Sequence, residues 1–266
     1  MIFASRSKKR DAVRSNLTSR MRAVCYSRRR HRVGKLAVSI VVIVLAACTT
    51  VPKVDLAPER PFKSITMLKV IEPTSQSVVN LGGAAGAFGL IGALAQNNLN
   101  EVHSKAYSEL VHHRTVAFAS PLESDISAQL RSAGYSVSSV DLRPTVRTDG
   151  RALDYSAVDV SDDAILHIWF TTLGYLSPPN KIAFQPWITV RVRLLEARTK
   201  KDLYFKTFTC GYQPTTEGIV HLNSDPRFEY DAFDALMAKV DDSIAGLHEC
   251  NRAIATRIAG DFAKAR

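Results

Sequence analysis

The sequence predicts an α+β domain: a mixed or antiparallel sheet of about five strands, helices packed on one face, and a long C-terminal helix. Segment 186–196 alternates in polarity, and a polar turn leads from it into a second strand over 203–210, as in a β-hairpin. Apolar residues recur at spacings of three, four and seven through 226–266, as on an amphipathic helix. A helix pattern followed at once by a strand pattern, over 120–140, supplies the mixture typical of this class.

Three further elements follow from apolar patterns. Residues 65–71 form the first predicted strand, and 100–111 form a short helix. Residues 164–173 are apolar on both faces, which is typical of a central strand. Along the hairpin strand, the residues expected to face the core are Ile188, Val190, Val192 and Leu194, and those expected outside are Thr189, Arg191 and Arg193.

The helix after residue 119 has a specific start signal. Ser120 and Glu123 form a capping box, with Pro121 at the first helical position. Gly134 should end this helix in a left-handed conformation, and a short strand over 135–140 follows.

The C-terminal helix has its own signals. Asp225 and Pro226 suit its N-cap and first position, and Gly246 is a candidate bend. Acidic residues in its first turns, with Lys264 and Arg266 at its end, complement the helix dipole.

The first 47 residues have the organisation of a signal peptide. Residues 1–35 hold 12 basic side chains and one acidic one, and 36–47 are uncharged and apolar. Twelve apolar residues suit a signal-peptide core, whereas a membrane-spanning helix needs about 20. Since the whole chain carries +10 and this leader +11, residues from 48 onward sum to −1. The basic character therefore belongs to the leader, and no nucleic-acid partner is expected.

The apolar run ends in Leu45-Ala46-Ala47-Cys48, which resembles the lipobox of bacterial lipoproteins. The resemblance implies a diacylglyceryl group on the Cys48 thiol, cleavage between Ala47 and Cys48, and acylation, typically with palmitate, of the new amino group. This covalent lipid is the only attached group expected, with no cofactor. An uncleaved signal anchor is the alternative, and translation can start at Met1 or at Met21.

Family sorting rules and composition give the remaining organisation. Because Thr49 rather than aspartate follows the cysteine, the resemblance implies the outer membrane, facing the periplasm. Residues 48–62 hold three prolines and no apolar period, so they should form the lipidated start and an extended tether. Residues 63–266 should form a single domain.

An uncharged glycine-rich insert, 78–95, is the unusual segment of this domain. Small residues four apart permit close helix contacts as in membrane helix pairs, but glycine also weakens a helix. A loop, a helix packed on its own domain or on another copy, and a membrane-inserting segment all remain open. The candidate assembly or membrane contacts are Gly82, Gly86, Gly89 and Gly92.

The four cysteines have different expected fates. Cys25 leaves with the leader, and Cys48 carries lipid. Cys210 and Cys250 remain in an oxidising compartment, where they form either a disulfide or two separate buried thiols.

No motif for catalysis or metal binding occurs: the GxSxG, HExxH, GxxxxGK and GxGxxG patterns are all missing from the sequence. His112 and His113 suit a solvated surface, and His167, among apolar residues, suits the core rather than a catalytic base. The acidic residues Asp159, Asp162 and Asp163 suit a polar turn better than a cation site. Trp187, Tyr204 and Tyr212 are expected either in the core or on an aromatic surface for a partner.

Strand order and the hairpin around Leu194-Leu195-Glu196-Ala197-Arg198-Thr199 give residues 62–212 a resemblance to two kinds of envelope domain. These are the curli-secretion-channel lipoproteins and the amino-terminal domains of TolB type. The leading hypothesis is a non-enzymatic envelope lipoprotein that binds or assembles with another envelope component. The alternatives are a membrane-associated oligomer or pore built through residues 78–95, and a hydrolase with an unrecognised site. Expected partners are the membrane, through the lipid anchor, and an envelope protein or a second copy.

Overall fold

The computed structural model describes residues 53–57, 62–82, 89–146, 153–179, 181–214 and 216–264. These residues belong to one compact unit, 47–266. The predicted signal peptide, its cleavage site at Ala47 and Cys48, and most of the predicted tether 48–62 lie outside the described residues.

The core of the fold is a mixed seven-stranded sheet, so the predicted class is correct but the expected five strands are too few. Its path is β3-β1-β6-β7-β8-β9, and β2 also pairs with β6. The central strands β6, β7 and β8 pair antiparallel, whereas β1, β2, β3 and β9 make parallel pairs. The bounds are β1 Ser64–Leu68, β2 Ser77–Asn80, β3 Ser136–Val140, β6 Ala164–Ser177, β7 Gln185–Glu196, β8 Asp202–Gly211 and β9 Ile219–Leu222. A small antiparallel pair, β4 Thr145–Val146 and β5 Leu153–Asp154, lies outside this sheet.

Strand β6 is long enough to serve two neighbours in turn. Its first residues pair with β1 and its last residues pair with β2. Its pairing with β7 has a register shift between Phe170 and Thr172. Gly174 has φ +152°, and a Cβ there would lie 1.9 Å from the carbonyl oxygen of Ser77. Glycine is therefore required where β2 joins the sheet.

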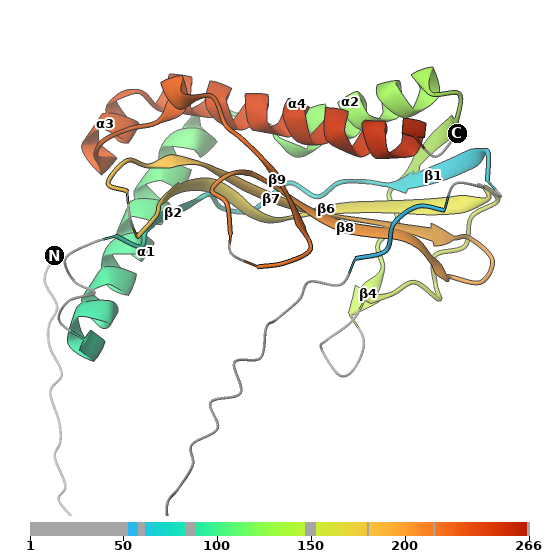
Figure 1. The fold of residues 1–266 in the computed structure, drawn as a ribbon, viewed down its shortest axis with the longest axis horizontal. Helices are drawn as coiled ribbons and strands as arrows, with labels where there is room; N and C mark the ends of the chain where they lie inside the picture. Colours follow the sequence, from blue (N-terminus) through green and yellow to red (C-terminus); the bar gives the residue numbers. More distant parts are fainter. Residues whose placement is uncertain are drawn as a thin grey trace, which may run out of the picture. The chain divides into compact units, whose positions relative to one another are not determined.

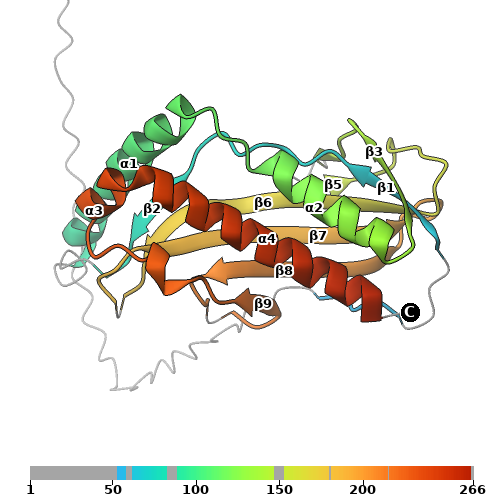
Figure 2. The same ribbon diagram turned by 90° about the horizontal axis from the view of Figure 1, so that it is seen from above.

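Helices α2 (Ala119–Ser132) and α4 (Val240–Lys264) cover one face of the sheet, as Figures 1 and 2 show. The predicted inward stripe of α2, namely Leu122, Ile126 and Leu130, is fully buried there. Helix α1 (Gly89–His113) packs beside β2 and begins well before the helix expected over 100–111. It starts inside the glycine-rich insert 78–95, which also contributes part of β2. That insert is therefore not one continuous loop.

The predicted capping box of α2 is wrong. The helix begins at Ala119, and no side chain of its N-cap, Phe118, caps it. Instead the Glu72 carboxylate, distant in sequence, accepts the backbone N–H groups of Phe118 (2.9 Å) and Ala119 (2.7 Å). Glu123 accepts the backbone N–H of Val70 and the hydroxyl of Ser139. The negative charge at the N-terminus of α2 is thus supplied by a tertiary contact. At the other end of the helix, Gly134 has the predicted left-handed conformation, with φ 81°.

The C-terminal helix is not continuous. Asp225 accepts the N–H of Arg227 as predicted for a cap, but it caps the short 3-10 helix η2 (Pro226–Phe228). Helix α3 (Phe233–Ala238) follows, and the break before α4 falls at Lys239 rather than at the predicted Gly246. Gly246 is buried instead, because a Cβ there would lie 2.7 Å from the Phe228 ring.

Candidate functional site

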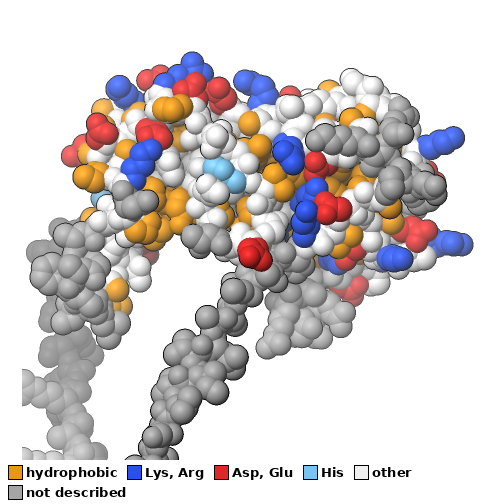
Figure 3. Space-filling model, viewed as in Figure 1, with side chains coloured by type: hydrophobic (Ala, Val, Ile, Leu, Met, Phe, Trp, Pro, Cys, Tyr) orange, Lys and Arg blue, Asp and Glu red, His pale blue; other side chains and the backbone are white. Residues whose placement is uncertain are grey.

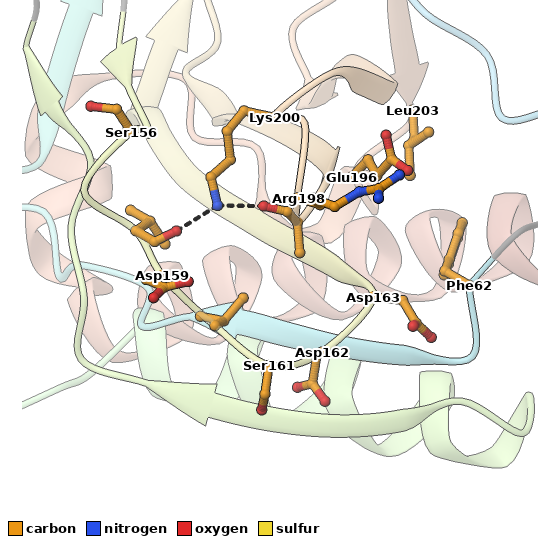
Figure 4. Close-up of a pocket in the computed structure, with 13 residues that line it drawn as sticks. Phe62, Ser156, Asp159, Ser161, Asp162, Asp163, Glu196, Arg198, Lys200 and Leu203 are labelled. Atoms are coloured by element: carbon orange, nitrogen blue, oxygen red, sulfur yellow. Dashed lines mark hydrogen bonds between the residues drawn. The ribbon is translucent and has the colours of Figure 1, made fainter.

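A polar pocket of about 680 Å³ lies where β6 begins and where β7 turns into β8 (Figure 4). It brings together the acidic turn predicted from sequence and the hairpin turn, which are far apart in the chain. Its charged lining residues are Asp159, Asp162, Asp163, Glu196, Arg198 and Lys200.

Three charged side chains of this pocket make hydrogen bonds that join neighbouring segments of the fold. Asp163 accepts the backbone N–H groups of Lys63 (2.8 Å) and Ser64 (3.0 Å), and these bonds lower the pKa of its carboxyl. Asp162 accepts hydroxyl hydrogen bonds from Thr66 and Ser138. The Lys200 ammonium donates to the backbone carbonyls of Val158 and Ala197, as the dashed lines in Figure 4 show. Within the described ranges, no group of three or more His, Cys, Asp or Glu residues could hold a metal ion.

His167 lies in a buried network on the sheet face away from α2 and α4, and only 6% of it is exposed. Its Nδ1 lies 2.8 Å from the Tyr155 hydroxyl, and its ring stacks on Trp169. Burial, together with the Arg193 charge, lowers the pKa of His167 to about 4, and burial raises the pKa of Tyr155 to about 12. Both groups are therefore neutral at physiological pH, and they share one hydrogen bond whose direction depends on the imidazole tautomer.

Arg193 completes this network. Its guanidinium lies 5.1 Å from the centre of the Tyr155 ring and makes two hydrogen bonds, of 2.6 and 2.9 Å, with the Asp202 carboxylate. The predicted core position of His167 is correct, but its polar partners come from segments that no sequence spacing connects.

The other candidate side chains are dispersed. His112 and His113 are exposed at the end of α1. Trp187 and Tyr212 make an edge-to-face contact with ring centres 6.3 Å apart. Tyr204 is buried and donates its hydroxyl to Asp261 of α4, so these three aromatics do not form one surface.

Cys210 and Cys250 form a disulfide, which was one of the two predicted alternatives. Their Cα atoms lie 5.6 Å apart, and both residues are buried. The bond joins β8 to α4 and thereby fixes the covering helix to the sheet.

A contact between the predicted tether and the sheet was not among the sequence predictions. Val54 and Phe205 form an isolated antiparallel bridge at the edge of β8. Next to it, the buried ammonium of Lys206 lies 2.8 Å from Asp55 and 2.6 Å from Asp261. Burial opposes the charge of Lys206, but hydrogen bonds to Asp261 and Asp55 outweigh it and raise the pKa of the lysine. The available signal was Lys206 itself, a lysine on the inward face that Tyr204, Phe208 and Cys210 otherwise make apolar.

The glycine candidates fall in different places. Gly82 follows β2 and packs against backbone carbonyls of the turn after β6. Gly89 and Gly92 lie in the first turns of α1, and Gly86 lies outside the described residues. Among the helices of the described ranges, none combines the length and the hydropathy needed to cross a bilayer.

No protein-family model matches the chain, and no curated protein matches it. A crystal structure from Xanthomonas campestris is similar with a TM-score of 0.36 and 12% identity, covering 80% of this chain and 94% of that one. A lipoprotein from Neisseria meningitidis is similar with a TM-score of 0.26 and 14% identity, covering 68% and 97%. The PelC dodecamer from Paraburkholderia phytofirmans gives 0.26 and 10%, covering 58% and 74%. Similarities at this level establish neither a family nor a function.

Proposed function

We propose that this chain is a lipoprotein of the bacterial envelope, held by lipid on Cys48 at the periplasmic side of the outer membrane, and that it acts by binding another envelope component. The observation that carries the proposal is the lipobox Leu45-Ala46-Ala47-Cys48 at the end of a signal-peptide-like leader. The disulfide between Cys210 and Cys250 supports export, because disulfides persist in oxidising compartments.

A binding role rather than catalysis is supported by how the polar groups are used. The acidic side chains Asp162 and Asp163 accept hydrogen bonds from residues 63–66 of the same chain, and Lys200 donates to two backbone carbonyls. His167 is buried against Tyr155 and Trp169. These bonds account for the groups as parts of the fold, and a binding protein needs no reactive constellation.

The anchor is tested by Cys48→Ser in the full-length chain. We expect metabolic labelling by a palmitate analogue to be lost and the precursor to accumulate, because serine lacks the thiol that carries the lipid. The matched control is Cys25→Ser, which alters a cysteine of the leader and should leave labelling unchanged. Labelling that persists in Cys48→Ser would refute the anchor.

Sorting and binding need separate measurements. Wild-type protein should fractionate with the outer membrane, whereas Thr49→Asp should move it to the inner membrane. For binding, a photoreactive residue in place of the exposed Arg191 should crosslink to an envelope component in intact cells. The same residue in place of Ala128, exposed on α2, is the control from the opposite face of the sheet. Equal or absent crosslinking from both positions would contradict binding through the Arg191 face.

A further inference from the structure

Exposed apolar side chains are concentrated at one end of the molecule. Among the described residues, five of the eight exposed large hydrophobics lie around the N-terminal half of α1 and the adjoining turns. Ile182 is 83% exposed, Val102 61% and Leu94 57%, and the other two are Leu81 and Leu99. In the space-filling view, hydrophobic side chains gather where β2 and α1 lie (Figure 3). Such a concentration marks a contact surface rather than chance exposure.

Helix α1 presents this surface because only its opposite face is held by the domain. Three polar side chains on that face, Asn100, Ser104 and Ser108, are spaced four residues apart. They accept the backbone N–H groups of β2 and of Gln76 at 2.8–2.9 Å. Val102 lies about 200° around the helix from Asn100 and Leu94 about 120° around from it, and both side chains are exposed. The first seven residues of α1, Gly89 to Ala95, are all apolar by sequence.

The described residues of the predicted tether, 53–57, lie on the same side of the sheet. Figure 1 shows residues 53–57, β4 and the N-terminal half of α1 on the side away from α2 and α4, which we call the tether side. Val54 and Phe205 exchange backbone hydrogen bonds of 2.8 and 2.9 Å, which hold the chain there. Val54 is only six positions after Cys48, so even a fully extended chain keeps the predicted lipid within about 20 Å of the bridge.

We infer that the N-terminal half of α1 is a second membrane contact, with Leu94 resting in the interface of the membrane to which Cys48 is anchored. The inference rests on the proposed function, since it takes the lipid on Cys48 as the first contact. Because the chain between Cys48 and Val54 is short, the tether side stays next to the bilayer. The apolar N-terminal half of α1 is the part of that side suited to the lipid interface. Strand β4, whose Val146 is 66% exposed, lies on the same side. Shallow contact of this kind needs no helix that spans the membrane.

The test is photocrosslinking in native membranes with the full-length, otherwise wild-type chain. A photoreactive amino acid in place of Leu94 should give phospholipid adducts severalfold above those from the control position, Ile71. Ile71 is a large hydrophobic residue of similar exposure, 47%, in the segment leading to Glu72, which caps α2. Val102, further along α1, serves as a second reporter in case the change at Leu94 disturbs the helix.

The outcomes separate the two proposals. Palmitate labelling of Cys48 without phospholipid adducts at Leu94 or Val102 would overturn the α1 contact and leave the anchor standing. Adducts to a second copy of the chain, or to another protein in place of lipid, would also overturn it and would identify α1 as a protein interface. Adducts at Leu94 without labelling of Cys48 would retain the α1 contact and overturn the proposed anchor.

Discussion

Val54 and Phe205 exchange two backbone hydrogen bonds, with N···O distances of 2.8 and 2.9 Å, across a sequence separation that only folding can bring together. The pair lengthens the edge of β8 by one bridge, next to the ion pairs of Lys206 with Asp55 and Asp261. Val54 and Asp55 of the segment that should lead to the lipid anchor are therefore part of the folded structure.

Releasing this contact should expose the edge of β8. Val54→Pro removes the N–H that bonds to the Phe205 carbonyl, so the amide of Phe205, which donates to the Val54 carbonyl, should exchange with deuterium faster. Peptides from β6 and β7 should keep their protection. Ala57→Pro, in the same segment but outside the bridge, is the control and should leave Phe205 protected. Unchanged exchange at Phe205 in Val54→Pro would show that the bridge contributes no protection.

The disulfide should make a large contribution to stability. It closes a separation of 40 residues between β8 and α4, for which chain entropy predicts about 3–4 kcal/mol. Cys210→Ser with Cys250→Ser should lower the free energy of urea unfolding by about that amount. A reductant should lower the unfolding free energy of the wild type to near that of the double variant, and it should leave the unfolding free energy of the variant unchanged. A variant as stable as the oxidised wild type would contradict this role.

His167 should make stability fall in mild acid. Its pKa is about 4 when folded and 6.5 when unfolded, so the unfolded chain binds the extra proton first as the pH drops. The stabilisation is complete above pH 6.5 and is lost progressively towards pH 4, by up to about 3 kcal/mol.

The matched variant for this pH effect is His167→Gln, which stays neutral. Its unfolding free energy should depend less steeply on pH between 6.5 and 4 than that of the wild type. His103 and His248, whose pKa values burial also lowers, are present in both proteins, so the difference isolates His167. Parallel pH profiles for the two proteins would mean that His167 is not buried in the neutral form.

The start of α2 distinguishes a local cap from a tertiary one. Glu72→Ala removes the carboxylate that accepts the N–H groups of Phe118 and Ala119, and it should cost about 1–2 kcal/mol in urea unfolding. Ser120→Ala should change stability by less than about 0.5 kcal/mol, because Ser120 is exposed and does not cap the helix. A larger loss of stability in Ser120→Ala than in Glu72→Ala would instead support the capping box predicted from sequence.

Local patterns predicted those elements whose partners are close in the chain. The hairpin of β7 and β8, the inward stripe of α2 and the left-handed Gly134 all follow from periodicity and turn chemistry. Strands β2 and β9 were missed because each has only four residues and gains its pairing from a longer strand already in the sheet. The early start of α1 was not predicted, because the glycines there disfavour a helix. Contacts between α1 and β2 stabilise the helix in the folded domain.

The sequence by itself determined the α+β class and the burial of His167, and it supplied the lipobox-like motif ending at Cys48 on which the proposed anchor rests, because each depends on the order or type of neighbouring residues. Only the tertiary structure decided that Glu72 caps α2, that Lys206 joins Asp55 to Asp261, and that Tyr155 meets His167. These contacts join residues whose separation along the chain sets no distance between them. They form when hydrophobic burial brings the segments together and each buried polar group takes the partner it then meets.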